Sequence, residues 1–372
     1  MTTVVIKVGS SSVTTPEGTA NRAALDAIAG DVAALRDGGT DVVIVTSGAV
    51  ALGWSAIAGD AARPKEIVAL QAASAVGQHR VMEAWQRSLG HHQLVGGQVL
   101  LGSLDFGHRQ QYLHARRTLR QLLDFGVVPI VNENDATSDE EIRFGDNDRL
   151  AALVAQLVDA QHLILLTDTA GLFTADPRVA ADASLISVVE EIDEAVLLIA
   201  GGTRSAVGSG GMASKVAAAR IGTASGVTVT IAEGERPHVV RDAIAGESVG
   251  TKFLAKDKTL SARKLWIAFA LSPVGSVTVD DGAARAVMSD GRSLLAAGVT
   301  AVSGTFDAGD AISVIGPHGL FARGLASVPS SVATSLMGQR RADHEGRQRS
   351  EIIHRDDLVV LVEAPNGNGK MA

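Results

Sequence analysis

Two lysines in this chain stand beside glycine-rich segments. Lys7 lies at the end of an apolar run and is followed closely by a glycine and three serines, and Lys215 comes shortly after the Gly-Ser-Gly-Gly segment at 208–211. Glycine lets backbone N–H groups approach an anion closely, and a lysine ammonium adds a positive point charge. Lysine is uncommon inside an apolar strand, so we interpret Lys7 as functional in preference to a lysine that merely reaches solvent at a sheet edge. Such segments are suited to binding phosphate groups.

A polar segment, residues 132–148, lies between an apolar run at 127–131 and a helix-like run at 150–158. It is rich in carboxylates and asparagines and has almost no side chain to bury. Ligands of open α/β sheets bind beyond the carboxyl ends of the strands, so this segment could hold a polar ligand or a metal ion. Taken alone, the same composition would also fit a solvated surface loop.

The two lysine segments and the polar segment together indicate phosphoryl transfer. Two lysines on separate glycine-rich loops can clamp a polyphosphate from both ends, and this reaction needs positioning and charge neutralisation rather than a covalent nucleophile. The acidic residues of 132–148 could bind an amine and hold the lysines in place. Mg²⁺ would then be needed beside the phosphates.

Other small polar motifs are open between a functional and a structural role. Ser47 follows an apolar strand and could be a helix N-cap, and Thr167-Asp168 has the same ambiguity. The segment 208–215 is not a Walker A loop and matches only the loose spacing G-x-G-x-x-A, so a surface loop before a helix is the alternative. The histidines show no zinc-site spacing, and there is no cysteine to supply a thiolate or a disulfide.

The composition predicts a globular protein of about two domains, since 372 residues exceed one typical core. Aromatic residues make up 3%, so the core must be built from Val, Ile, Leu and Ala, which favours helices layered on a parallel sheet. The formal net charge of −8 argues against a binder of nucleic-acid backbone, although local basic patches could exist. Residues 1–13 show no secretory signal, and no apolar run reaches the roughly 18 residues of a spanning helix, so we expect a cytoplasmic protein.

Short apolar strands alternate with helices over the first 250 residues, which predicts an α/β domain with a mainly parallel sheet. We expect strands at 3–8, 41–46, 94–101, 127–131, 162–166 and 227–232, and helices at 21–37, 65–89, 110–124, 150–158 and 212–225. Strand after strand ends in small or polar residues. This repetition is typical of one active edge of a sheet.

The pattern changes near residue 250, where a lysine-rich polar stretch begins. Beyond it we expect strands at 266–271, 276–280, 299–303, 311–315 and 319–327 and a short helix at 283–289, which make a small, mostly β domain. The predicted organisation is a catalytic domain at 1–250, a linker at 251–262, a second domain at 263–357 and a C-terminal tail at 358–372.

From about Val4 to Asp357 the chain resembles the glutamate 5-kinases, in which an amino-acid kinase domain precedes a PUA domain. Each motif alone would be weak, but their combination in this order is specific. The motifs are Val5 to Ser10, Val43 to Ala49, Val131 to Asp135, Gly145 to Asp148, Leu166 to Asp168, Gly171 to Pro177, and Gly210-Gly211-Met212 with Lys215. The resemblance implies a three-layer α/β sandwich with a mainly parallel central sheet, the amino-acid kinase fold, plus a small mostly-β PUA domain.

The resemblance also implies an activity, the ATP-dependent phosphorylation of the γ-carboxylate of L-glutamate to L-glutamyl 5-phosphate, the first step of proline biosynthesis. Lys7 and Lys215 would neutralise the phosphates, and Asp148 would hold both lysines. No residue is assigned as a metal ligand, although Mg²⁺ is expected with ATP. The implied glutamate contacts are Ser47, Asp135, Asn147, Asn132 and Asn134, and the implied ATP contacts are Lys7, Thr167, Asp168, Ser209, Gly210, Gly211, Met212, Ala213, Ser214 and Lys215.

Partners implied by the resemblance are proline as a feedback inhibitor, further copies of the chain in a dimer or tetramer, and RNA through the PUA domain. The chain departs from the expected motifs at Asp139-Glu140-Glu141, which adds acidic charge, and at Ala213-Ser214, which replaces a more hydroxyl-rich pair. Two alternatives are another amino-acid kinase, of the acetylglutamate kinase or aspartokinase type, and an RNA-binding or regulatory protein with a vestigial kinase fold.

Overall fold

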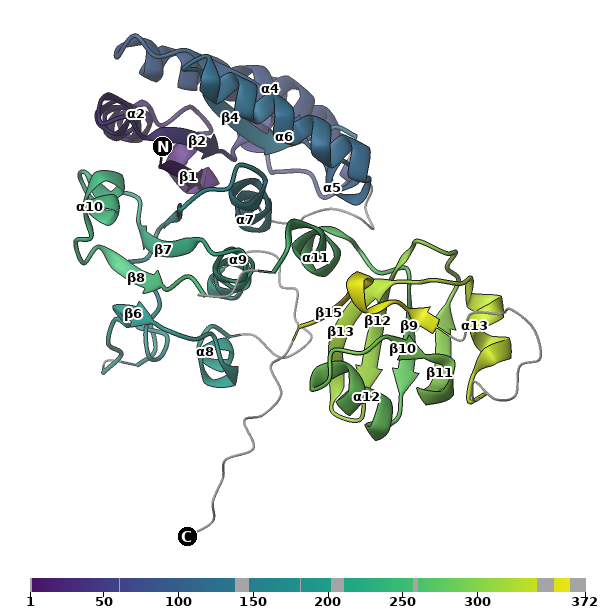
Figure 1. Ribbon diagram of the computed structural model, residues 1–372. Coiled ribbons are helices and arrows are strands. Elements are labelled where there is room, and N and C mark those ends of the chain that lie inside the picture. Colours follow the sequence, from purple (N-terminus) through teal and green to yellow (C-terminus); the bar gives the residue numbers. More distant parts are fainter. Residues whose placement is uncertain are drawn as a thin grey trace. The chain divides into compact units, whose positions relative to one another are not determined.

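The structure, a computed structural model, describes residues 2–59, 61–137, 147–180, 182–201, 211–256, 260–339 and 351–361. The chain divides into two compact units, residues 1–259 and 260–372. Figure 1 shows the helices and strands of both. Within the described ranges, no helix combines the length and the apolar character that crossing a membrane requires.

In the described part of the first unit, eight strands form one sheet. Its order is β3 (Gly96–Leu101), β4 (Val128–Glu133), β2 (Asp41–Val45), β1 (Thr3–Val8), β5 (His162–Thr167), β7 (Thr228–Glu233), β8 (Gly250–Phe253) and β6 (Val188–Val189). Neighbouring strands run parallel, except that β7 and β8 are antiparallel. The central parallel strands β1, β2, β4 and β5 are almost fully buried, because helices cover both faces.

The helices of the first unit are α1 (Ser10–Val13), α2 (Arg22–Asp37), α3 (Ala49–Ala58), α4 (Ile67–Gly90), α5 (Ser103–Gly107), α6 (Arg109–Asp124), α7 (Asn147–Leu157), α8 (Glu194–Ile199), α9 (Met212–Ala224) and α10 (Val239–Ala245). Alternate residues of β1, Val4, Ile6 and Val8, share a core with α2, α4 and α10. Lys7 points to the other face, where α7 packs against β1 and α9 (Figure 1). The predicted three-layer fold with a mainly parallel sheet is confirmed.

Helices α3 and α4 meet backbone to backbone at two glycines. A Cβ atom built on Gly77 would lie 1.7 Å from the Ala49 carbonyl oxygen, and one on Gly53 would lie 1.7 Å from the Ala73 carbonyl oxygen. No side chain fits at either position, so the crossing brings α4 as close as two helices can approach. The crossing also brings the next residue, Gln78, into contact with strand β4.

We expect Gly77→Ala to lower the free energy of unfolding of the first unit by about 3 kcal/mol or more, because the clash is with backbone atoms that cannot swing away. The matched control is Gly90→Ala at the end of the same helix, where a Cβ would meet nothing within 4 Å. It should change stability by less than about 1 kcal/mol, in the stabilising direction. Calorimetric melting compares the two. Equal melting temperatures would contradict the proposed crossing.

The described second unit contains a five-stranded sheet and a strand pair. The five strands, in order, are β11 (Val299–Gly304), β9 (Gly275–Val279), β12 (Ala311–Gly316), β13 (Gly319–Leu325) and β15 (Leu358–Val360), and the pair is β10 (Leu294–Leu295) with β14 (Glu351–Ile353). The helical pieces are α11 (Ala262–Leu265), η1 (Trp266–Ala270), α12 (Asp281–Met288), η2 (Ala296–Gly298), α13 (Ser330–Leu336) and η4 (Arg355–Asp357). This unit has its own apolar core. The predicted small, mostly β domain is confirmed.

Three expectations about this part of the chain differ from the structure. The strand predicted at 266–271 is wrong, because Trp266–Ala270 is a π-helix that continues α11, whose N-cap is Ser261. A short apolar run without alternation fits a buried helix as well as a buried strand. Residues 251–253 of the expected linker belong to β8, and residues 358–360 of the expected tail form β15. In both cases strand pairing continues past the change in composition.

Candidate active site

The strand register brings the carboxyl ends of four strands to one edge of the sheet. Lys7 of β1 lies opposite Val45 of β2 and Leu165 of β5, and Val45 lies opposite Val131 of β4. The residues that follow these positions therefore emerge together. They include Ser47 after β2, Asn132 near the end of β4 and Thr167 at the end of β5.

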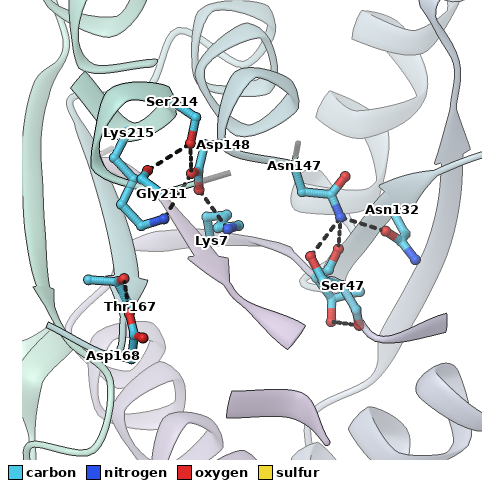
Figure 2. A network of polar contacts seen from close by, with 11 residues as sticks. Lys7, Ser47, Asn132, Asn147, Asp148, Thr167, Asp168, Gly211, Ser214 and Lys215 are labelled. Carbon is cyan, nitrogen blue, oxygen red and sulfur yellow. Dashed lines mark hydrogen bonds and ion pairs between the residues drawn. The ribbon is translucent and has the colours of Figure 1, made fainter. Parts of the chain in front are cut away.

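Asp148 joins the two lysines of the glycine-rich segments. Lys7 Nζ lies 2.6 Å from Asp148 Oδ1, and Lys215 Nζ lies 3.1 Å from Asp148 Oδ2. Figure 2 shows the two ammonium groups on either side of the carboxylate. The three side chains come from β1, α7 and α9, and they are 6%, 0% and 10% exposed for Lys7, Asp148 and Lys215. The fold thus unites residues more than 200 positions apart in the chain.

This cluster places two ammonium groups around one carboxylate, away from water. Burial of charges costs free energy unless partners compensate, and the shared carboxylate is one such partner. The Ser214 hydroxyl lies 3.0 Å from Asp148 Oδ2 and 2.9 Å from the Gly211 carbonyl oxygen, and its single proton can be donated to either acceptor. Two ammonium groups held side by side are suited to binding an anion such as a phosphate.

A second cluster, the amide cluster, consists of Asn147, Asn132, Ser47 and the backbone of Thr46. Asn147 Nδ2 lies 2.6 Å from the Thr46 carbonyl oxygen, 2.8 Å from Ser47 Oγ and 2.9 Å from Asn132 Oδ1, so its two N–H groups are shared among three acceptors. Figure 2 shows these contacts converging on one nitrogen. Asn147 precedes Asp148 on α7, so the first turn of that helix serves both clusters.

Gly48 makes the tight turn that presents Ser47. Its φ is +97°, and a Cβ there would lie 2.9 Å from Val13 Cγ1. A residue with a side chain would be strained by the backbone conformation and would also clash. The chain can therefore pass from β2 into α3 only with glycine at this point.

The sequence did not reveal two polar residues of α4 that adjoin the amide cluster. Gln78 contacts Asn132, and Ser74 donates to Asp135 Oδ2 at 3.2 Å. Both are buried. In a 24-residue amphipathic helix they look like ordinary surface residues. Their position on the buried face, next to Ala73 and Gly77, is apparent only in the structure.

The remaining predicted site residues lie at neighbouring strand and helix ends or outside the described residues. The Thr167 hydroxyl donates to Asp168 Oδ1 at 3.0 Å, at the end of β5 (Figure 2). Asn134 follows β4, and its backbone N–H donates to the Leu101 carbonyl oxygen at 3.0 Å. Gly211 precedes α9, whose first residues are Met212, Ala213 and Ser214. Ser209, Gly210 and the acidic residues Asp139, Glu140 and Glu141 lie outside the described residues.

The described residues do not form a protein cage for Mg²⁺. Within the described ranges no group of three or more His, Asp or Glu side chains is arranged to hold a metal ion. Both oxygens of Asp148 already face ammonium groups.

Two kinds of comparison with known proteins agree on the family: matches to models of protein families, and matches to whole protein chains. The model of the amino acid kinase family matches residues 2–233, and that of the PUA domain matches residues 275–345. The glutamate 5-kinase of Pelobacter propionicus is 45% identical over 363 residues, which cover 96% of this chain and 97% of that protein. The glutamate 5-kinase of Nitrosomonas eutropha is 44% identical with the same coverage.

A solved structure shows the same fold in the first unit. Carbamate kinase from Giardia lamblia bound to AMP-PNP matches 68% of this chain and 99% of its own chain, with a TM-score of 0.50 and 18% identity. The resemblance drawn from the motifs is confirmed by the match to whole relatives. The chain therefore belongs to the amino acid kinase family, among its glutamate 5-kinases with a C-terminal PUA domain.

Proposed function

We propose that this chain transfers the γ-phosphoryl group of ATP to the γ-carboxylate of L-glutamate, which gives L-glutamyl 5-phosphate for proline biosynthesis. The observation that carries the proposal is the buried Asp148, which pairs with Lys7 and Lys215 together. Two oriented ammonium groups can neutralise the charge that develops on the transferred phosphoryl group. The acceptor carboxylate is already ionised near neutral pH, so no protein base has to activate it.

The amide cluster and its neighbours form the proposed glutamate side of the site. Ser47, Asn132, Asn134 and Asn147 supply hydrogen-bonding groups, and Asp135 is a suitable partner for the α-ammonium of the substrate. This set lies at the ends of β2 and β4 and at the start of α7. It is adjacent to Asp148 through Asn147, so a bound amino acid would have its side-chain carboxylate near the lysines.

ATP is the co-substrate of the proposed reaction. Its phosphates would lie between Lys7 and the start of α9, where Gly211, Met212, Ala213, Ser214 and Lys215 follow one another. Thr167 and Asp168 are proposed to contact the nucleotide at the end of β5, and Ser209 and Gly210 are assigned to it from the sequence alone. Mg²⁺ would enter on the phosphates and supply additional charge neutralisation there.

Four further expectations stay predictions. They are feedback inhibition by proline, assembly into a dimer or tetramer, binding of RNA by the PUA domain, and a cytoplasmic location. Each concerns a ligand, a further molecule or a cellular location rather than the geometry of one chain. The domain limits predicted from the sequence also stay a proposal: a kinase domain at residues 1–250 and a PUA domain at residues 263–357. The compact units of the structure are residues 1–259 and 260–372.

The substrate is tested by offering ATP with L-glutamate, N-acetylglutamate or L-aspartate and trapping the acyl phosphate with hydroxylamine. We expect the hydroxamate from glutamate alone, because Asp135 suits a free α-ammonium group and the whole-chain relatives are glutamate 5-kinases. Mixtures without ATP are the control. Product from only N-acetylglutamate or aspartate would support another amino-acid kinase. No ATP-dependent product from any of the three would support a regulatory protein with a vestigial kinase fold.

A further inference from the structure

A glutamine on α4 lies behind the amide cluster. Gln78 is 7% exposed, its Oε1 accepts from Asn132 Nδ2 at 3.0 Å, and its Nε2 donates to the Glu133 carbonyl oxygen at 3.1 Å. Both hydrogen bonds cross from α4 to β4. The close crossing at Gly77 brings this side chain to the end of the strand.

The backbone determines which end of each amide faces its neighbour. The Glu133 carbonyl oxygen can only accept, so the Gln78 atom beside it is the NH₂ group, and the Gln78 oxygen faces Asn132. Asn132 must therefore donate to Gln78. Its own oxygen then accepts from the Glu133 N–H and from Asn147 Nδ2, each at 2.9 Å.

The contacts of Asn147, the third amide, require the same orientation of the donor and acceptor groups. Asn147 Nδ2 also faces the Thr46 carbonyl oxygen, which can only accept. Three backbone groups, the carbonyl and N–H of Glu133 and the carbonyl of Thr46, thus require one orientation of all three amides. Loss of Gln78 would leave the orientation of Asn132 with support on one side only.

A second branch leads from Gln78 to Asp135. Gln78 Nε2 lies 3.4 Å from Ser74 Oγ, one turn earlier on α4, and the Ser74 hydroxyl donates to Asp135 Oδ2. Because the serine oxygen accepts from Gln78, its single proton is left for the carboxylate. Gln78 therefore connects two groups that are proposed to bind the amino acid.

We propose that Gln78 is a positioning residue for the amino-acid substrate. It holds Asn132, and through it Asn147 and Ser47, in one orientation, and it directs Ser74 toward Asp135. This inference rests on the proposed function, in which Asn147 and Asp135 bind glutamate. No hydrogen bond of Gln78 within the described residues leads to Lys7, Asp148 or Lys215, so its effect is on glutamate and not on ATP.

The first test is Gln78→Met, which keeps the length of the side chain and removes its hydrogen bonds to Asn132, Glu133 and Ser74. Asn132 Nδ2 and the Glu133 carbonyl oxygen then lose a buried partner. We expect the KM for glutamate to rise about 10-fold to 100-fold, while the KM for ATP changes by less than about twofold. The matched control is Gln86→Met, two turns further along α4, where Gln86 Oε1 accepts from the Gly96 N–H at 3.0 Å. It should leave both KM values unchanged.

The second test is Gln78→Glu, for which the KM for glutamate is measured relative to that of wild type at about pH 8.5 and about pH 6. The ionised carboxylate can accept from Asn132 but cannot donate to the Glu133 carbonyl oxygen, whereas the protonated form regains an O–H donor. Burial at this position raises the pKa of the introduced carboxyl group toward this range. The ratio of the variant KM for glutamate to that of wild type should fall at least about fivefold at the lower pH.

An unchanged KM for glutamate in Gln78→Met, or an equal rise in the KM for ATP, would overturn the proposal. A Gln78→Glu ratio that is the same at both pH values would also overturn it. Melting curves identify any folding defect, which lowers the amount of active enzyme without changing KM. Wild-type enzyme that fails to phosphorylate glutamate contradicts the proposed function instead, whatever the Gln78 variants do.

Discussion

Asp148→Asn is expected to lower kcat on the order of 1000-fold while the protein still folds at low temperature. The substitution keeps the shape of the side chain but removes the carboxylate that pairs with Lys7 at 2.6 Å and Lys215 at 3.1 Å. Removing a single preorganised electrostatic group typically costs 100-fold to 1000-fold in turnover, and Asp148 orients two such groups that act as a unit. The measurement is kcat at saturating ATP and glutamate.

The same substitution should also lower stability by about 3 to 5 kcal/mol, because it leaves two buried ammonium groups without their shared counter-charge. A matched control is Asp159→Asn. Asp159 also receives two cations, Arg116 and Arg120, each at 2.6 Å, but it is 56% exposed. Exposed pairs contribute roughly 0 to 1 kcal/mol, so this variant should keep its turnover and nearly all its stability. Similar losses in both variants would contradict a special role for the buried carboxylate.

Lys215→Ala is expected to lower kcat about 100-fold to 1000-fold and to leave the KM for glutamate within a fewfold of wild type. Lys215 Nζ faces Asp148, and no hydrogen bond within the described residues joins it to the amide cluster, so the loss should fall on phosphoryl transfer. A fall in kcat without a rise in KM is the signature of an interaction made in the transition state. Steady-state kinetics with each substrate varied in turn separates these quantities.

Lys252→Ala supplies the control for Lys215→Ala. Lys252 is a partly buried lysine on β8, and it lies near His162 at the opposite, amino-terminal end of β5. Its removal takes away a positive charge from the same compact unit without touching the site, and kcat should stay the same. Turnover that is unchanged in Lys215→Ala would remove this lysine from the proposed mechanism.

Most elements of the first unit follow from local sequence. The strand predicted at 3–8 and the helix predicted at 21–37 agree with β1 and α2 almost to the residue. Uninterrupted apolar runs between turn residues and strong helix caps are local signals, and Asn21 indeed caps α2 through Ala24 N–H. The run at 266–271 carried no such signal, since a short buried helix and a short buried strand are equally apolar.

The sequence allowed only some residues of the candidate site to be predicted. Lys7 and Lys215 could be proposed because a lysine beside a glycine-rich segment is well placed to bind an anion, whereas the role of Asp148 was implied by the resemblance to the glutamate 5-kinases. Gln78 and Ser74 could not, because a helix of 24 residues offers many polar positions. Only the approach of α4 to α3 at Gly77 shows which of them reach the sheet.

The sequence by itself determined the kinds of chemical group present and the edge of the sheet where they gather. It did so because strand ends, glycine turns and helix caps depend on residues a few positions apart. Only the tertiary structure decided that Asp148 lies between two lysines and that the amides of Gln78, Asn132 and Asn147 run in one direction. Those relations depend on strand register and on a helix crossing, which join residues tens to hundreds of positions apart.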